Sequence, residues 1–148
     1  MTDYSSLSAE PKQFLALTGY TVAEFDALLP AFAERFEAQM HAFKLAGKPR
    51  RRPYVSYRNS PLPTIAGKLL FILVSLRKAT TQDILGVVFG MAQPVANQWS
   101  HCLHDGLNQA LAQLGASPAR HAADKHYFQD GAERPIQRPK APEVQEDY

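Results

Sequence analysis

The chain has 148 residues, of which 45% are hydrophobic and 20% charged, and its formal net charge at pH 7 is +2. The composition is globular, no run approaches the roughly 20 apolar residues of a membrane span, and the polar N-terminus lacks a secretory core. The single cysteine, Cys102, excludes an internal disulfide and a zinc cluster of the usual kind, and we interpret it as a small apolar filler. We expect a cytoplasmic protein with one domain, or one domain and the beginning of another.

The positive charge is concentrated in the middle of the chain. Residues 1–47 carry 3 basic and 6 acidic side chains. Residues 48–120 carry 9 basic and 2 acidic side chains, and residues 121–148 carry 4 basic and 6 acidic ones. Because phosphate contacts supply most of the sequence-independent affinity for nucleic acid, this distribution indicates a polyanionic partner for the middle segment.

Residues 1–20 are interpreted as a polar N-terminal arm. Thr21 and Glu24 then have the spacing of a capping box, which predicts a helix from Val22. Its apolar stripe comprises Val22, Phe25, Leu28, Leu29, Phe32, Phe36, Met40 and Phe43. Pro30 interrupts the stripe, so we expect a kink or two abutting helices that end near Gly47. We interpret the segment as a scaffold over the core, although its aromatic stripe also suits a homodimer contact.

Residues 47–63 are rich in proline and arginine and are predicted to form a loop. Its basic side chains, which are interleaved with Tyr54 and Tyr57, are Lys48, Arg50, Arg51, Arg52 and Arg58. Such a segment can follow a phosphate backbone or place arginines in a narrow minor groove. The alternative is a solvated loop.

A strongly apolar helix is predicted to begin at Thr64 and to end near Arg77 and Lys78, whose charges suit the helix dipole. The residues expected to support the core are Ile65, Leu69, Leu70, Ile72, Leu73 and Leu76.

Residues 80–103 are typical of a helix-turn-helix. Gly86 lies where two helices cross closely, and Gly90 lies where a tight turn favours positive φ. Pro94 falls in the first turn of the second helix, where its missing N–H costs nothing. The residues predicted to pack inward are Leu85, Phe89, Met91, Ala96 and Trp99.

The second helix of this unit has two distinct sides. Gln93, Asn97 and His101 share one side within roughly 80° of arc, with Gln98 at its flank. The opposite side carries Val95, Trp99, Cys102 and Leu103. Side-chain amides can bond adenine N6 and N7, so we interpret this as a recognition helix for the major groove. Ordinary solvent-facing residues are the alternative.

This helix is predicted to continue to Leu114, where Gly115 stops it and Pro118 prevents a restart. Residues 21–117 are therefore expected to form an all-α domain, and the first 115 or so residues to contain four or five helices. Residues 118–148 have a turn signal at Asp130–Gly131 but no closed core, and they are expected to be irregular or β.

The chain contains LTGYTVAEFDALLPAF, a basic loop, LPTIAGKLLFILVSLRKATTQDILGVVFGMAQPVANQW and DGAERPIQRPK in that order. From Leu17 onward this arrangement resembles the N-terminal half of bacterial insertion-sequence DDE transposases. The most specific part of the resemblance is the last motif, DG-x-E-R-P-x-x-R-P, which surrounds the first catalytic aspartate of that family.

The resemblance implies that the helix-turn-helix binds double-stranded DNA at the terminal inverted repeats of a mobile element, in association with a bacterial nucleoid. It also implies that residues 118–148 begin a ribonuclease-H-like domain, in which Asp130 matches the first of three carboxylates that hold two Mg²⁺ ions. No residue before Tyr148 matches the other two carboxylates. We therefore expect neither catalysis nor a cofactor in this chain alone, with Asp130 a catalytic metal ligand only in a complete enzyme.

Three interpretations remain open. The chain is a non-catalytic DNA-binding part of a transposase, as an upstream frameshift product, a fragment or a decayed copy. Alternatively, joining to a downstream-frame product completes a metal-dependent endonuclease and strand transferase. A third interpretation is a stand-alone transcriptional regulator that dimerises through its aromatic helix and binds a palindromic site.

Overall fold

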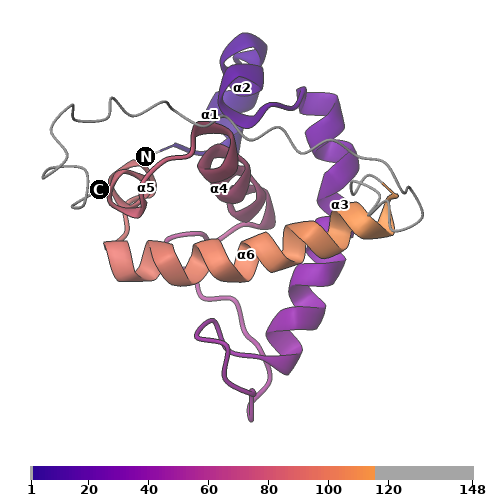
Figure 1. Ribbon diagram of the computed structural model, residues 1–148, viewed down its shortest axis with the longest axis vertical. Helices are drawn as coiled ribbons and strands as arrows, with labels where there is room; N and C mark the ends of the chain where they lie inside the picture. Colours follow the sequence, from indigo (N-terminus) through magenta and orange to yellow (C-terminus); the bar gives the residue numbers. More distant parts are fainter. Residues whose placement is uncertain (1, 116–148) are drawn as a thin grey trace, which may run out of the picture. The chain divides into compact units, whose positions relative to one another are not determined.

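The computed structural model describes residues 2–115, and most of this part of the chain is helical (Figure 1). Its helices are α1 (Tyr4–Ser8), α2 (Pro11–Thr18), α3 (Val22–Ala42), α4 (Ile65–Lys78), α5 (Gln82–Phe89) and α6 (Gln93–Gln113). The only strand-like pairing within the described range is an isolated antiparallel bridge between Phe43 and Pro49. The predicted all-α class is therefore confirmed for residues 2–115. The expected ribonuclease-H-like start at residues 118–148, with Asp130, lies outside the described residues.

Helix α4 is the most deeply buried element and packs against α1, α2, α3, α5 and α6. All residues from Lys68 to Val74 are buried, as expected for a helix that is apolar on every side. Its start agrees with the sequence prediction, because Thr64 Oγ1 accepts a hydrogen bond from Gly67 N at 3.0 Å. Although α4 is strongly apolar, neither it nor another helix of the described range is long and apolar enough to cross a membrane.

Helix α3 begins at Val22 with the predicted capping box. Glu24 N donates to Thr21 Oγ1 at 3.2 Å, and Thr21 N donates to Glu24 Oε2 at 2.8 Å. Of the two alternatives expected at Pro30, a kink or two abutting helices, the second is wrong, because α3 continues through Pro30 as one helix. Proline removes only one hydrogen bond, to the carbonyl of Asp26, and both residues are exposed, so that carbonyl can bond to water.

The buried side of α3 follows the predicted stripe, with Phe25, Leu28, Phe32, Phe36 and Met40 in the core. Two residues predicted to be apolar core members are instead exposed. Phe43 is 46% exposed because α3 ends at Ala42 rather than near Gly47, and Leu76 is 50% exposed near the end of α4. Both residues lie at the C-terminal end of a helix, where the side chains are no longer covered by the core.

The first 20 residues contain two short helices where the sequence indicated a polar arm. Leu7 and Phe14 are buried, one from each helix. The Tyr4 ring stacks on Phe25 with centroids 5.1 Å apart, and the Phe14 ring meets Phe25 edge-on at 5.2 Å. These aromatic contacts join α1 and α2 to Phe25 of α3, and both short helices also pack against α4.

Helices α5 and α6 are joined by a tight connection that depends on two glycines. Gly90 has φ 69°, in the left-handed region that glycine adopts without strain. A Cβ built on Gly86 would lie 2.5 Å from the backbone oxygen of Met91, so only glycine fits there. Both predictions for these glycines are confirmed. Pro94 lies in the first turn of α6, as predicted, and Gly115 with φ 68° follows the end of that helix.

Candidate nucleic-acid interface

The candidate interface is the outer side of α6, which starts directly after the turn at Gly90. Gln93, Gln98 and His101 are exposed, and Asn97 is half-buried. The inner side of the helix carries the buried residues Ala96, Trp99, Cys102, Leu103, Gly106, Leu107 and Ala110. This division follows the helical periodicity of the sequence and leaves a polar side without lysine or arginine facing outward.

Gln82, at the start of α5, connects two of the predicted interface residues. Its Nε2 donates to Asn97 Oδ1 at 2.8 Å, and its Oε1 accepts from Gln93 Nε2 at 2.7 Å. The three side chains form an amide chain that we call the Gln93–Gln82–Asn97 network. Gln82 was not among the residues predicted from the sequence. Its position as the first residue of the preceding helix was the available signal.

The network orients the amides and leaves the Nδ2 donors of Asn97 and the Oε1 acceptor of Gln93 unused within the described residues. The residues that carry this donor–acceptor pair, Asn97 and Gln93, lie about one turn apart on the same side of α6. Adenine presents an acceptor at N7 and a donor at N6 in the major groove. Because Asn97 is already held by Gln82, little side-chain freedom remains to be lost on binding.

Positive charge is scarce on this face. The sequence between residues 79 and 119 contains no lysine or arginine, whereas Asp83 and Asp105 are exposed. The basic residues nearest along the chain are Arg77 and Lys78, both exposed at the end of α4. Contacts from α5 and α6 themselves would therefore go mainly to bases, with phosphate contacts supplied by neighbouring elements.

The basic loop between α3 and α4 folds back onto the end of α3. Lys44 N donates to Lys48 O at 2.7 Å, and Arg50 N donates to Ala42 O at 3.0 Å, on either side of the Phe43–Pro49 bridge. The Arg50 guanidinium lies 5.3 Å from the centre of the Tyr54 ring. The loop predicted from the sequence therefore has a defined path, although it contains neither a helix nor an extended strand.

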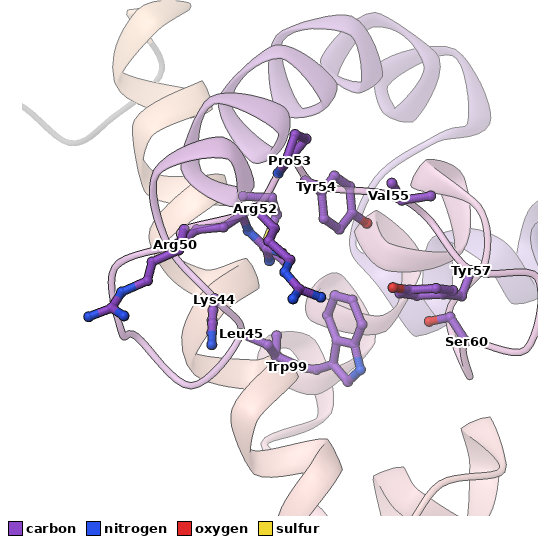
Figure 2. Close-up of a pocket in the computed structure, with 12 residues that line it drawn as sticks. Lys44, Leu45, Arg50, Arg52, Pro53, Tyr54, Val55, Tyr57, Ser60 and Trp99 are labelled. Atoms are coloured by element: carbon purple, nitrogen blue, oxygen red, sulfur yellow. The ribbon is translucent and has the colours of Figure 1, made fainter.

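This path creates a cavity of about 860 Å³, which we call the Trp99 cavity (Figure 2). It is lined by Met40, Lys44, Leu45, Arg50, Arg51, Arg52, Pro53, Tyr54, Val55, Tyr57, Ser60 and Trp99. Figure 2 shows the side chains of Tyr54, Tyr57 and Trp99 around one open space. The cavity thus combines cationic groups from the loop with aromatic rings from the loop and α6.

The Trp99 cavity and the Gln93–Gln82–Asn97 network lie on different sides of α6. Trp99 and Asn97 are two residues apart, which separates their side chains by roughly 160° around the helix axis. The structure therefore brings Arg50, Arg51 and Arg52 together beside Trp99, and not beside Asn97. Lys48 and Arg58, which were also predicted to contact DNA, are exposed loop residues outside the cavity lining.

A buried lysine lies beneath the cavity. Lys68 is 3% exposed, its Nζ donates to Leu62 O at 2.7 Å, and it lies 5.2 Å from the Phe36 ring centre and 5.6 Å from that of Trp99. Burial lowers the pKa of Lys68 to about 8. The ammonium group ties the end of the basic loop to the core and holds Trp99 in place. Lys68 was not predicted to be buried, because a lone lysine in an apolar helix resembles a surface residue.

Cys102 is 6% exposed, and its Sγ lies 3.8 Å from Met40 Sδ. Burial raises the pKa of the thiol to about 11, which agrees with a filler rather than a nucleophile. Within residues 2–115, no group of three or more histidine, cysteine, aspartate or glutamate residues could hold a metal ion. Asp130, the predicted metal ligand, lies outside that range.

Comparison of the chain with family models, curated proteins and solved structures gave no match. A function is therefore assigned to these residues from their own geometry and chemistry. Two groupings carry that assignment: the amide network on the outer side of α6, and the cationic, aromatic cavity on its other side.

Proposed function

We propose that α5 and α6 form a helix-turn-helix that binds double-stranded DNA with sequence specificity through the outer side of α6. The observation that carries this proposal is the Gln93–Gln82–Asn97 network, which holds two amides at the exposed start of α6. Amides in this position can read adenine through the major groove, and His101, one turn further on, can reach a base or a phosphate.

The connection between the two helices supports the proposal. A recognition helix must be held rigidly against the helix that precedes it, since base contacts depend on accurate placement. Gly86 allows the close approach of the Met91 carbonyl, and Gly90 allows the sharp turn. Gln82 adds a polar contact across the same junction, so the outer amides and the helix packing depend on each other.

Phosphate contacts are assigned to cations outside α5 and α6. Arg77 and Lys78 end α4 only a few residues before Gln82, and Lys48 and Arg58 are exposed on the basic loop. The sequence suggested that Arg50, Arg51 and Arg52 grip the backbone beside the recognition helix. Their position beside Trp99 favours a different ligand for these three residues, which is argued in the next subsection.

The sequence resemblance extends this proposal to a biological role. The described domain would recognise the terminal inverted repeats of an insertion sequence as the N-terminal part of a DDE transposase. Strand cleavage is not assigned to this chain alone. Asp130 and Mg²⁺ would enter the chemistry only when two further carboxylates complete the catalytic site, for instance through a downstream-frame product.

The test begins by selecting duplexes that bind the full chain from a random-sequence DNA pool, followed by titration of the selected duplex. Replacement of Asn97 by alanine removes one half of the donor–acceptor pair. We expect Asn97→Ala to lose about 1–3 kcal/mol of binding at one base position and to relax the sequence preference there. Non-specific binding at low salt should remain, because phosphate contacts are unchanged.

The matched control is Asn108→Ala, which makes the same substitution on the same side of α6 but three turns further along. This variant should retain both affinity and preference. The proposal fails if no duplex is enriched by the full chain, or if Asn97→Ala keeps the sequence preference of the unmodified protein.

A further inference from the structure

We propose that the Trp99 cavity is a second binding site, which takes a single nucleotide: an aromatic base together with its phosphate. The nucleotide is either free or an unpaired residue of a DNA strand. The site is separate from the duplex-binding face proposed above, because the two lie on different sides of α6. It goes beyond that function and does not depend on it.

The cavity offers an aromatic surface that no neighbouring ring uses. Tyr57 is 73% exposed and lines the cavity, whereas Tyr54 is half-buried and has Arg50 above its ring. Trp99 also lines the cavity but is only 6% exposed, so little of its ring is accessible to a ligand. A base entering the cavity would therefore stack mainly on Tyr57 and make a smaller contact with Trp99.

The same cavity concentrates positive charge. Lys44, Arg51 and Arg52 line it, and all three are exposed, while no described residue of the lining is acidic. Arginine presents a planar set of donors that suits phosphate oxygens, and lysine adds a point charge. These positive charges, with no acidic residue in the lining, lie beside the exposed ring of Tyr57. The combination suits a ligand that has one anionic and one aromatic part.

The volume and rigidity of the cavity fit a small ligand. Its volume of about 860 Å³ lies within the range of roughly 300–1,000 Å³ usual for small-molecule sites. Trp99 is held from the core side by Phe36, with ring centroids 6.3 Å apart, and by the Lys68 ammonium. The side of the cavity that contains Trp99 is therefore ordered without a ligand. Inorganic phosphate would use only the cations, and an acidic peptide would leave the aromatic surface uncovered.

Trp99 is the only tryptophan of the chain, so its fluorescence reports directly on this cavity. The full chain is titrated with thymidine 5′-monophosphate, thymidine, inorganic phosphate, hexaglutamate, a short single-stranded oligothymidylate and a blunt duplex. We expect saturable changes in Trp99 fluorescence with the monophosphate and the oligothymidylate, and none at equal concentration with the other four. Tighter binding of the oligothymidylate than of the monophosphate would identify a DNA strand as the source of the nucleotide; equal or weaker binding would identify the free nucleotide.

Two variants test the parts of the site. Tyr57→Ala removes the stacking surface and should weaken monophosphate binding at least about fivefold, while Tyr57→Phe should retain it. Arg52→Ala should weaken it to a similar degree, whereas Lys12→Ala, which also removes one exposed positive charge, should not. Because Tyr57 and Arg52 are exposed, the thermal unfolding of these variants should match that of the unmodified protein.

The proposal is overturned if neither nucleotide ligand changes the fluorescence, or if inorganic phosphate or hexaglutamate produces the same change. It is also overturned if Tyr57→Ala binds the monophosphate as the unmodified protein does. Failure here is distinguishable from failure of the duplex-binding proposal, because that proposal is read from duplex selection and from Asn97→Ala, on the other side of α6.

Discussion

Lys68 makes contacts that join the basic loop to the core, although burying its charge lowers the stability of the folded protein. Its ammonium group is held by Leu62 O and by the faces of Phe36 and Trp99, and no acidic side chain of the described range bonds to it. Burial disfavours the charged form, which lowers the pKa of Lys68 to about 8 from its ordinary value of 10.5. The folded protein therefore gives up this proton more readily than the unfolded chain.

The pH dependence of stability follows from that difference. Between about pH 8 and 10.5 the unfolded chain holds more protons at Lys68, so this residue makes the free energy of unfolding rise with pH. Below pH 8 the lysine is charged in both states, and the cost of burying the charge is fully present. We expect the stability of the unmodified protein, relative to Lys68→Met, to increase by up to about 1.4 kcal/mol per pH unit across this window.

Urea unfolding of both proteins at pH 7.5 and 9.5 measures this difference, because the tyrosine titrations affect the two proteins alike. Parallel pH profiles would show that Lys68 is not buried as a cation.

At the scale of the elements, the junction of α5 and α6 depends on backbone contact. Gly86 and Gly106 are both buried helical glycines, but their surroundings differ. A Cβ on Gly86 would meet the Met91 carbonyl at 2.5 Å, whereas a Cβ on Gly106 would meet only side-chain atoms, at 3.6 and 3.8 Å. The first contact is with backbone that cannot move without changing the turn, and the second is ordinary packing.

These surroundings predict opposite results for one substitution. Gly86→Ala should lower the free energy of unfolding by about 1–3 kcal/mol, because the helices must separate. Gly106→Ala should leave it unchanged or raise it by up to about 1 kcal/mol, since alanine favours the helix. Chemical unfolding at neutral pH compares the two variants. Equal losses for both, or no loss for Gly86→Ala, would contradict the close packing of α5 against the start of α6.

For the whole molecule, the sequence predicted those helices that combine a local end signal with a clear apolar pattern. The capping box at Thr21, the cap at Thr64 and the glycines at 86 and 90 act locally, so α3, α4, α5 and α6 could be located from residue types alone. Helices α1 and α2 also carry end signals, at Asp3, Pro11 and Gly19, but their few apolar side chains pack against distant elements, so the sequence did not locate these two helices.

The candidate sites likewise depend on contacts between elements that the sequence alone does not show. The outer side of α6 follows from helical periodicity, but the contact of Gln82 with Asn97 joins two helices and depends on their packing. The path of the basic loop likewise depends on its bridge to the end of α3 and on the buried Lys68. Sequence spacing therefore identified the arginines as a group, but only the folded loop shows that they lie beside Trp99.

The central claim is that DNA meets the protein at the Gln93–Gln82–Asn97 network. The most direct measurement is a nuclear magnetic resonance titration of the full chain with its selected duplex, following the side-chain amide signals. Those of Gln82, Gln93 and Asn97, assigned from the corresponding alanine variants, should shift, while those of Asn108, three turns further along the same helix, should not. Shifts at Asn59 with unchanged signals from Gln82 and Asn97 would contradict the claim and would assign duplex binding to the basic loop instead.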